Sequence, residues 1–371
     1  MNDVTNYSFS RKISIATNLS CNLKCIYCYE AERYTKTFDL EKTKNRIRYY
    51  LNRPTEKGTV IDLHGGEPFL VFNKIKELCE WLWNSNFPER YVVHTTTNGT
   101  LVHADIQEWL FQHKEKFHVK LSLDGCKIAH NINRCNSFDL IDYAFFAKCW
   151  PHEYVKMTIS PLTIQYLSQS IIFLHSVPFL KIQANFAELV DWNDTDLVDS
   201  FKKEMKLLSE YYTLNNTPER CTLFYNNYSN VLAKKQNYLD KLCTNGCKVA
   251  FDIQGDKSYP CQLVLPSVCG QSVADSFVRK VETGNSTVSG KCTSCAFLPL
   301  CSTCYGANYI ERGTISKRDP NQCCFNKLRI KEVCLFDYNR IINLQSSEIT
   351  KEDKIAMNAI QLLLPSLELV E

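Results

Sequence analysis

The chain has 371 residues, of which 44% are hydrophobic and 22% charged, a composition typical of a globular protein with one large domain, or a large and a small one. The net charge of +3 is too small to indicate a nucleic-acid or membrane partner. The segment Met1–Lys12 lacks the apolar stretch of a signal peptide, and no apolar run approaches the ~20 residues of a membrane span. We therefore expect a cytoplasmic protein, whose 19 cysteines indicate metal ligands rather than disulfides.

Six short β-type runs alternate with helical patterns over the first two hundred residues. The predicted strands are Lys12–Thr17, Thr59–His64, Tyr91–Thr96, His118–Asp124, Tyr154–Ser160 and Leu180–Ala187. The predicted helices are Asp39–Leu51, Asn73–Asn84, Ala104–Lys114, Phe138–Cys149, Ile164–His175 and Asp194–Leu214. Such regular alternation predicts a parallel sheet, because each strand needs a crossover helix to return. Six units favour a partial (β/α)6 barrel of TIM type, with its active site at the carboxyl ends of the strands.

The alternation stops near Asn215. We divide the chain into a barrel (residues 1–215), a connecting segment (216–241), a cysteine-rich iron–sulfur domain (242–340) and a helical tail (341–371). The region Leu242–Cys334 is poor in long periodic segments, so metal is expected to stabilise it. In the tail, Ile349–Glu371 predicts an amphipathic helix interrupted at Pro365.

Three cysteines follow the first predicted strand within eight residues: Cys21, Cys25 and Cys28. Thiolates are the usual ligands of iron–sulfur clusters. Three ligands for four irons leave one iron open for substrate chemistry, whereas a structural zinc site requires four ligands. The alternatives for this segment are a zinc knuckle or three incidental thiols.

The pattern Cys-x3-Cys-x-aromatic-Cys, with Tyr27 as the aromatic residue, resembles the signature of the radical SAM superfamily. The resemblance implies a [4Fe–4S] cluster that binds S-adenosylmethionine (SAM) and cleaves it reductively to a 5′-deoxyadenosyl radical, which abstracts hydrogen from a substrate. The cofactor supplies this chemistry, and the protein orients and shields the reactants.

Further motifs fall at successive predicted strand ends, which strengthens the resemblance. Gly65-Gly66-Glu67-Pro68 resembles the family's GGEP motif, in which Glu67 would accept from the ammonium group of SAM. Thr97-Asn98-Gly99-Thr100 resembles its TNGT segment. Ser122-Leu123-Asp124-Gly125, followed by His130 and Arg134, resembles its SxDG…H…R stretch. Taken singly, these motifs also fit turns, helix caps and structural hydrogen bonding.

The resemblance assigns several of these residues to SAM. The expected cofactor-binding set is Tyr27, Gly65, Gly66, Glu67, Ser122, Asp124, Arg134, Thr158, Gln183 and Asn185. Polar side chains on the fifth and sixth strands would point toward ribose and adenine. No catalytic base is assigned.

The C-terminal cysteines resemble the SPASM extension, which implies two auxiliary [4Fe–4S] clusters. Cys243, Cys247, Cys261 and Cys304 would hold the first. Cys292, Cys295, Cys301 and either Cys323 or Cys324 would hold the second. Two spacings differ from the family pattern by one residue, at Gly255–Cys261 and at Cys301–Cys304. Zinc ribbons fit the Cys-x2-Cys pairs equally well on spacing alone, and a zinc-binding interaction module is the alternative from another class.

Family members with SPASM domains mostly modify peptides or proteins. Anaerobic sulfatase maturases of this group have an aspartate after the cysteine that corresponds to Cys261, where this chain has Gln262. This difference favours a peptide maturase that installs a thioether or carbon–carbon crosslink over a formylglycine-forming oxidase. We expect as partners a peptide or small protein substrate and an electron donor such as a flavodoxin or ferredoxin. Leader recognition would need either a separate leader-binding protein or a surface of the barrel.

Overall fold

The computed structural model describes most of the chain, from Phe9 to Val370. The described ranges are residues 9–30, 35–177, 179, 181–194, 196–215, 219–233, 248–253, 257–282, 288, 290–301 and 303–370. The statements below concern these residues. Cys243, Cys247 and Gly255 lie outside them.

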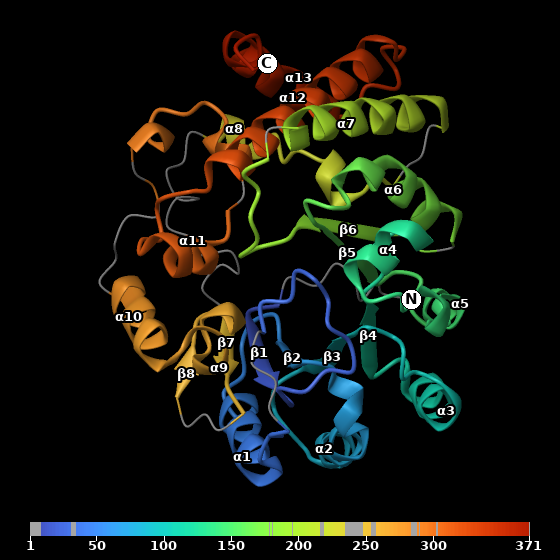
Figure 1. Ribbon diagram of the computed structural model, residues 1–371, viewed down its shortest axis with the longest axis vertical. Coiled ribbons are helices and arrows are strands. Elements are labelled where there is room, and N and C mark those ends of the chain that lie inside the picture. Colours follow the sequence, from blue (N-terminus) through green and yellow to red (C-terminus); the bar gives the residue numbers. More distant parts are fainter. Residues whose placement is uncertain are drawn as a thin grey trace.

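Six strands form the parallel wall of a partial barrel (Figure 1). They are β1 (Arg11–Ala16), β2 (Thr59–His64), β3 (Tyr91–Thr97), β4 (Phe117–Leu121), β5 (Tyr154–Ile159) and β6 (Lys181–Phe186). Strands β1 to β4 pair in sequence order, and β5 pairs with β6, all in parallel. The predicted α/β fold with a parallel sheet is confirmed.

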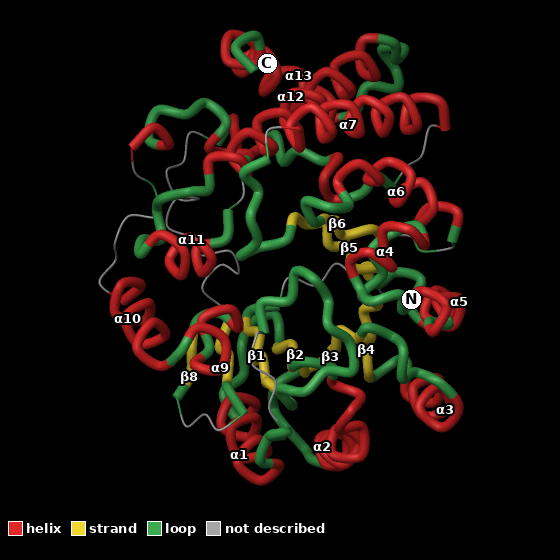
Figure 2. The backbone as a smooth tube through the Cα atoms, in the orientation of Figure 1, coloured by secondary structure: helices red, strands yellow, loops and turns green. Residues whose placement is uncertain are grey.

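The two groups of strands meet through a short contact. A single parallel bridge links Ser122, just after β4, to Lys156 on β5, and Leu123 N donates to Lys156 O over 2.9 Å. The wall is therefore open and curved, with β1–β4 on one side and β5–β6 on the other (Figure 2).

A hairpin from the C-terminal half extends the sheet beyond β1. Strand β7 (Lys248–Phe251) pairs in parallel with β1, and β8 (Ser258–Tyr259) pairs antiparallel with β7. The sheet order is consequently β4-β3-β2-β1-β7-β8. The sequence did not indicate these strands, which place the segment around Cys261 beside the start of the chain.

Helices cover the outer side of the strands. They are α1 (Leu40–Leu51), α2 (Phe72–Asn84), α3 (Ala104–His113), α4 (Lys127–Asn133), α5 (Tyr143–Cys149), α6 (Leu167–Ser176) and α7 (Asp196–Asn215). The Asp39 side chain accepts from Lys42 N and so caps α1, as its residue type favours. The predicted helix 138–149 is divided into a 3-10 turn (Phe138–Leu140) and α5, because Ile141 is extended and Asp142 begins a new helix. Another 3-10 turn (Ile164–Tyr166) precedes α6.

The C-terminal part is more helical than its sequence suggests. It contains α8 (Ser229–Leu232), α9 (Pro266–Cys269), α10 (Gln271–Glu282), α11 (Tyr305–Arg312), α12 (Pro320–Ile342) and α13 (Lys351–Leu367). Helix α12 packs against α7 and α13 and carries Cys323, Cys324 and Cys334. Pro365 lies inside α13, so the expected interruption there is wrong. The helix continues past the proline to Leu367, so Pro365 lies in its last turn, where it removes one backbone hydrogen bond.

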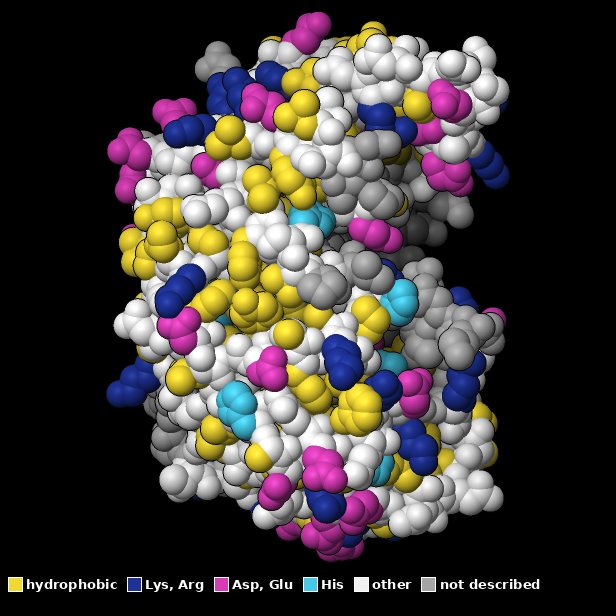
Figure 3. All heavy atoms as spheres, turned by 90° about the vertical axis from the view of Figure 1, so that its right-hand side faces the viewer, with side chains coloured by type: hydrophobic (Ala, Val, Ile, Leu, Met, Phe, Trp, Pro, Cys, Tyr) yellow, Lys and Arg dark blue, Asp and Glu magenta, His cyan; other side chains and the backbone are white. Residues whose placement is uncertain are grey.

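Alternation along the strands separates a polar lumen from an apolar shell. Ile13, Ile61, Val93 and Val155 are buried in the main hydrophobic core, whereas their neighbours Lys12, Asp62 and Lys156 line a cavity. Seen from the side, the outline of the molecule is indented between its upper and lower parts (Figure 3). No described helix is both long and apolar enough to cross a bilayer.

Candidate functional site

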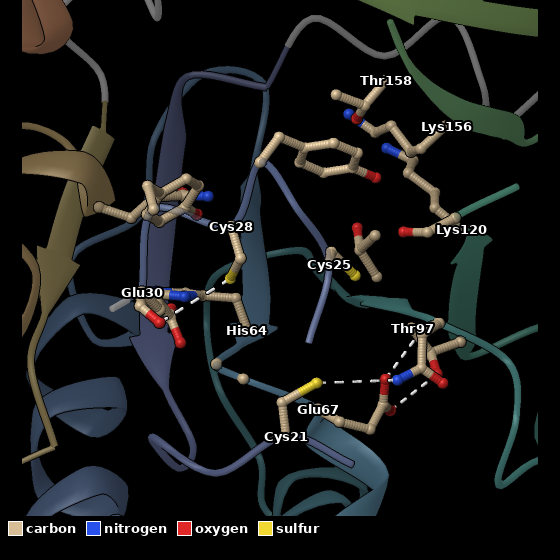
Figure 4. A pocket seen from close by; sticks show the side chains of 18 of the residues that line it. Cys21, Cys25, Cys28, Glu30, His64, Glu67, Thr97, Lys120, Lys156 and Thr158 are labelled. Carbon is tan, nitrogen blue, oxygen red and sulfur yellow. Dashed lines mark hydrogen bonds between the residues drawn. The ribbon is translucent and has the colours of Figure 1, made fainter. Parts of the chain in front are cut away.

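The three N-terminal cysteines face one cavity. This cavity, of about 360 Å³, lies at the carboxyl ends of the strands and is lined by Cys21, Cys25 and Cys28. Figure 4 shows their sulfur atoms arranged around a common space. Cys28 N donates to Cys25 O over 3.1 Å, and Leu23 N lies 3.4 Å from the Cys21 sulfur as a donor. The loop therefore presents three thiols together, as the spacing predicts.

The two glycines of the second motif hold this loop against β2. A Cβ atom on Gly66 would lie 2.1 Å from Ser20 O, and one on Gly65 would lie 2.5 Å from Asn18 O. Both neighbours are backbone atoms, so no side chain can move away. Gly66 N donates to Asn18 O over 3.1 Å. Glycine is therefore required because backbone passes directly against backbone.

Glu67 is buried at the wall of the same cavity. Its Oε1 accepts from Thr97 Oγ1 at 2.7 Å and from Phe69 N at 3.1 Å, and its Oε2 accepts from Asn98 N at 2.8 Å. Burial raises the pKa of this carboxyl group, and the three donors oppose the shift. Since a carboxylate oxygen accepts more than one hydrogen bond, Oε2 retains the capacity to accept from a ligand.

The third motif fastens the cysteine loop from another side. Asn98 Nδ2 donates to Asn22 Oδ1 over 2.9 Å, and Asn22 Nδ2 donates to Thr100 Oγ1 over 2.7 Å. Asn98 also lines the cavity. This segment thus fixes the backbone that follows Cys21.

Tyr27, the aromatic residue of the cysteine motif, is joined to Asp124 and Arg134. Its hydroxyl donates to Asp124 Oδ2 over 2.6 Å. Arg134 Nε lies 2.9 Å from the same oxygen, and the guanidinium lies over the Tyr27 ring at 5.5 Å. Although burial alone would lower it, the pKa of Arg134 is raised because Asp124 is adjacent. The arrangement is a buried ion pair that supports the loop.

Asp124 itself is buried behind this group. It also accepts from Asn133 Nδ2 at 3.1 Å and from Thr158 N at 2.9 Å. The cavity is lined by Tyr27 and Arg134, but Asp124 is not among its lining residues. Its position fits a residue that orients Tyr27, Arg134 and Thr158, and a direct contact with SAM stays a prediction.

Of the remaining predicted SAM contacts, some line the cavity and one does not. Ser122, Thr158 and Asn185 line the cavity. Gln183 is half-buried on β6 opposite Lys156, and it is not among the lining residues. His130 is buried beneath the site, where its Nδ1 accepts from Asp124 N at 3.2 Å and its Nε2 pairs with Ser137 Oγ at 3.1 Å.

The sequence analysis missed the polar lumen below the cysteines. Additional charged and polar residues line the cavity: Lys12, Tyr29, Glu30, Asp62, His64, Lys120, Lys156 and Gln262. Burial lowers the pKa of His64 to about 4, so its imidazole is neutral at pH 7. The signal in the sequence was the run of charged residues at alternate positions of β1, β2, β4 and β5, which a wholly apolar barrel interior does not contain.

Two stacked histidines, the buried His118 and the half-buried His94, lie near Lys120 of this lumen. His118 Nδ1 lies 3.1 Å from Glu153 Oε1, and His94 stacks on His118 with ring centroids 5.0 Å apart. Ligand atoms of these three residues all lie within 4.8 Å of one another. Lys120 Nζ lies 3.6 Å from Glu153 Oε2, so a cation already balances the carboxylate.

Four C-terminal cysteines come together as predicted. A small cavity of about 20 Å³ is lined by Cys292, Cys295, Cys301 and Cys323, together with Arg318. Cys324 is not among its lining residues. Arg318 Nη1 donates to the Cys301 sulfur over 2.7 Å. The geometry therefore favours Cys323 as the fourth ligand of this group.

The other predicted auxiliary set is only partly described. Cys243 and Cys247 lie outside the described residues. Cys261 is half-buried at the end of the β7–β8 hairpin, directly before Gln262. Cys304 caps α11, where its sulfur accepts from Ala307 N at 3.4 Å. Their grouping with Cys243 and Cys247 stays a prediction.

The residues of the first site fit a cluster with one open iron. Among the described cysteines, only Cys21, Cys25 and Cys28 line the main cavity. Three thiols in this set match iron–sulfur ligation with one position left for another ligand. A zinc site of four thiolates would lack its fourth sulfur among these lining residues.

Comparisons with known proteins agree with this geometry. A family model described as a 4Fe-4S single cluster domain matches residues 16–134, which extend from the cysteine loop to Arg134. An uncharacterized protein of Methanocaldococcus jannaschii is 36% identical over 109 residues, 29% of this chain and 36% of that protein. A cysteine-type anaerobic sulfatase-maturating enzyme of Clostridium perfringens is 31% identical over 123 residues, 31% of this chain and 32% of that enzyme. The chain thus spans about a third of the length of these relatives.

Solved structures extend the likeness along the chain. Native anSMEcpe with bound AdoMet and Cp18Cys peptide has a TM-score of 0.67 at 20% identity, covering 90% of this chain and 98% of that one. The chain therefore shares the fold of anSMEcpe. Streptococcus suis SuiB bound to S-adenosylmethionine has a TM-score of 0.59 at 18% identity, covering 85% of this chain and 77% of that one. This likeness in fold continues beyond the barrel into the cysteine-rich part of the chain.

Proposed function

We propose that this chain is a radical SAM peptide maturase that installs a thioether or carbon–carbon crosslink. The observation that carries the proposal is the placement of Cys21, Cys25 and Cys28 around one cavity that is also lined by the buried Glu67. A [4Fe–4S] cluster held by these thiolates would bind SAM and supply a 5′-deoxyadenosyl radical that removes hydrogen from the substrate.

The chain's own residues would orient SAM. Glu67 Oε2 is available to accept from the ammonium group of the cofactor. Ser122, Thr158 and Asn185 line the wall on the opposite side and would contact ribose and adenine. Tyr27 and Arg134, fixed by Asp124, would keep the cysteine loop in place while the cofactor binds.

Similar structures support a peptide as the substrate. anSMEcpe is described with a bound Cp18Cys peptide, and SuiB with the precursor peptide SuiA. The two structures match this chain with TM-scores of 0.67 and 0.56. A peptide or small protein substrate is therefore the class that we propose.

Gln262 favours crosslinking over formylglycine formation. Its side chain lines the cavity beside Cys261, and its Oε1 is hydrogen-bonded to Lys248 Nζ. An amide does not accept a proton as a carboxylate does. At the position where the sulfatase maturases have an aspartate base, this chain therefore has a side chain that cannot act as a base.

The auxiliary cysteines would hold clusters that remove the surplus electron after hydrogen abstraction. Cys292, Cys295, Cys301 and Cys323 would ligate one [4Fe–4S] cluster, and Cys243, Cys247, Cys261 and Cys304 another. A flavodoxin or ferredoxin would supply the electron that starts the reaction. A separate protein would present the leader of the peptide.

Anaerobic turnover tests the proposal directly. Reconstituted protein with dithionite and SAM should release 5′-deoxyadenosine, and a variant with alanine at positions 21, 25 and 28 should release none. A C269A variant serves as control, because Cys269 does not line the cavity. Equal release by the triple variant would refute the radical SAM assignment.

Formylglycine formation is the second candidate, favoured by the similarity to the Clostridium perfringens sulfatase-maturating enzyme. The two activities differ in product when tested on short peptides encoded beside the gene. A crosslink removes two hydrogens, retains sulfur and introduces no aldehyde group. Formylglycine reacts with hydrazides, and its formation from cysteine replaces sulfur by oxygen.

A further inference from the structure

The strands of the barrel direct more lysines than carboxylates into the cavity. Lys12, Lys120 and Lys156 project into the lumen from β1, β4 and β5, and Asp62 projects from β2. Their strand neighbours Ile13, Ile61, Leu121 and Val155 are buried in the surrounding core. The lysines therefore face the cavity because strand alternation leaves them no other direction.

Two of the three lysines have partners. Lys12 Nζ lies 2.9 Å from Asp62 Oδ2, and Lys120 Nζ lies 3.6 Å from Glu153 Oε2. Lys156 makes no ion pair or side-chain hydrogen bond with the described part of the chain, although it lies within electrostatic range of Lys12, Lys120, Lys248 and Asp62. An ammonium group in such a position favours an anion from outside the chain.

Lys156 lies deeper in the lumen than Thr158 and Asn185, at the level of Ser122 and Gln183. It precedes Thr158 by two residues on β5, about 6.6 Å along a strand. Figure 4 shows Lys156 and Lys120 together on one side of the cavity, away from the sulfur of Cys28. Its position below Thr158 suits a group that approaches the cofactor from the lumen.

We propose that Lys156, with Lys120 beside it, binds a carboxylate of the peptide substrate. The proposal rests on the proposed function, since it names the substrate feature that this lumen selects. The carboxylate belongs to an aspartate or glutamate side chain or to the end of the peptide. In either case a charge-assisted hydrogen bond at a buried site would fix the peptide relative to the radical.

The electrostatics of the lumen agree with a single bound negative charge. Burial, and then the charges of Lys120 and Lys12, lower the pKa of Lys156 to about 7. A carboxylate placed against Lys156 would reverse this shift and restore a full positive charge. Asp62 and Glu153 are already engaged by the other two lysines, so they do not compete for it.

Peptide binding by the reconstituted holoenzyme with SAM, without reductant, tests the proposal. The probes are capped glycine pentapeptides with aspartate, asparagine or lysine at the centre, and an asparagine pentapeptide with a free carboxyl end. Ligand-detected NMR titration gives the dissociation constants. We expect the wild type to bind a carboxylate peptide about tenfold more tightly than the capped asparagine peptide, and the two carboxylate probes identify the source.

Charge variants make the test specific. K156M should abolish the preference and K156R should retain it, whereas K156E should prefer the lysine peptide. K76M is the matched control, because Lys76 is exposed on α2 and its removal should change nothing. A circular dichroism spectrum and melting temperature matching those of the wild type confirm that a variant is folded.

Two results would overturn the proposal. One is equal binding of carboxylate and asparagine peptides by the wild type. The other is a parallel loss of SAM binding in K156M, which would assign Lys156 to the cofactor. Release of 5′-deoxyadenosine without peptide is measured separately, so failure of the radical SAM assignment is distinguished from failure of the carboxylate site.

Discussion

The hydroxyl of Tyr27 donates a 2.6 Å hydrogen bond to Asp124, and this contact joins the cysteine loop to the far side of the barrel opening. Asp124 also accepts from Thr158 N on β5. One carboxylate therefore connects the loop after β1 with the strand across the gap between β4 and β5. This carboxylate thereby holds loop and strand relative to each other.

Replacing Tyr27 with phenylalanine should weaken this connection. A buried hydrogen bond to a charged group contributes about 1.5–3 kcal/mol, so Y27F should unfold at lower denaturant concentration and lose iron to a chelator faster than the wild type. Y49F is the control, because Tyr49 is exposed on α1. Unchanged iron release in Y27F would show that the loop is held by other contacts.

Gly66 should not tolerate a side chain. In G66A the new methyl group would lie 2.1 Å from Ser20 O, so the cysteine loop must move away from β2. We expect purified G66A to contain one cluster fewer than the wild type, a loss of about four irons per chain. It should also release little 5′-deoxyadenosine. G306A is the comparison, because its Cβ would meet side-chain atoms of Leu263 and Val264 at 3.3–3.5 Å, which need to move by only a few tenths of an ångström. Normal iron content in G66A would contradict the packing argument.

The adjacent cysteines of α12 should behave differently. Cys323 lines the small cavity with Cys292, Cys295 and Cys301, and Cys324 does not. C323S should therefore lose about four irons per chain, while C324S should retain the wild-type content. Iron and acid-labile sulfide analysis checks both variants. Loss of iron in C324S but not in C323S would make Cys324, and not Cys323, the cluster ligand.

Acid should destabilise the protein through its buried histidines. Burial, followed by the charge of Arg134, lowers the pKa of His130 from 6.5 to about 4. The unfolded chain therefore binds more protons between these values, and the stability falls as the pH decreases from 6.5 toward 4. At pH 5 this residue costs about 2 kcal/mol relative to neutral pH.

H130Q isolates this effect, because glutamine does not titrate but retains an acceptor for Asp124 N. Urea unfolding between pH 5 and 7.5 should show a flatter pH dependence for H130Q than for the wild type. H152Q, which changes an exposed histidine before β5, should leave the slope unchanged. An identical pH dependence of stability in H130Q and the wild type would mean that folding does not lower the pKa of His130.

The barrel was predictable because each of its signals is local. Apolar alternation placed β2 at Thr59–His64, as observed, and the cysteine and glycine motifs fell on the adjacent strand ends. Carboxyl ends of parallel strands lie on one edge, so residues far apart in sequence were expected to meet there. The structure brings Cys21, Glu67 and Ser122 to the same cavity.

Helix α12 was missed although its signals were present. Asp319 caps the helix and Pro320 occupies its first turn, a pair typical of helix starts. Phe325, Leu328 and Val333 are buried along one face. The cysteine pair and the polar residues of this segment obscured the helical spacing of its apolar residues. The hydropathy of the region therefore resembled that of a loop stabilised by metal.

Other features depend on tertiary contacts that no local pattern specifies. The β7–β8 hairpin joins the barrel through pairing with β1, more than two hundred residues earlier in the chain. The isolation of Lys156 is likewise a property of the assembled lumen, because Lys12 and Lys120 resemble it in sequence but have carboxylate partners. Only the fold distinguishes them.

The pairing of β7 with β1 has a consequence for electron flow. Strand β1 leads into Cys21, and the β7–β8 hairpin ends at Cys261. If both cysteines hold clusters as proposed, the adjoining β1–β7 and β7–β8 ladders set the tunnelling distance between the two redox centres. That spacing would be established when the sheet folds and would stay constant through turnover, with no hinge between donor and acceptor.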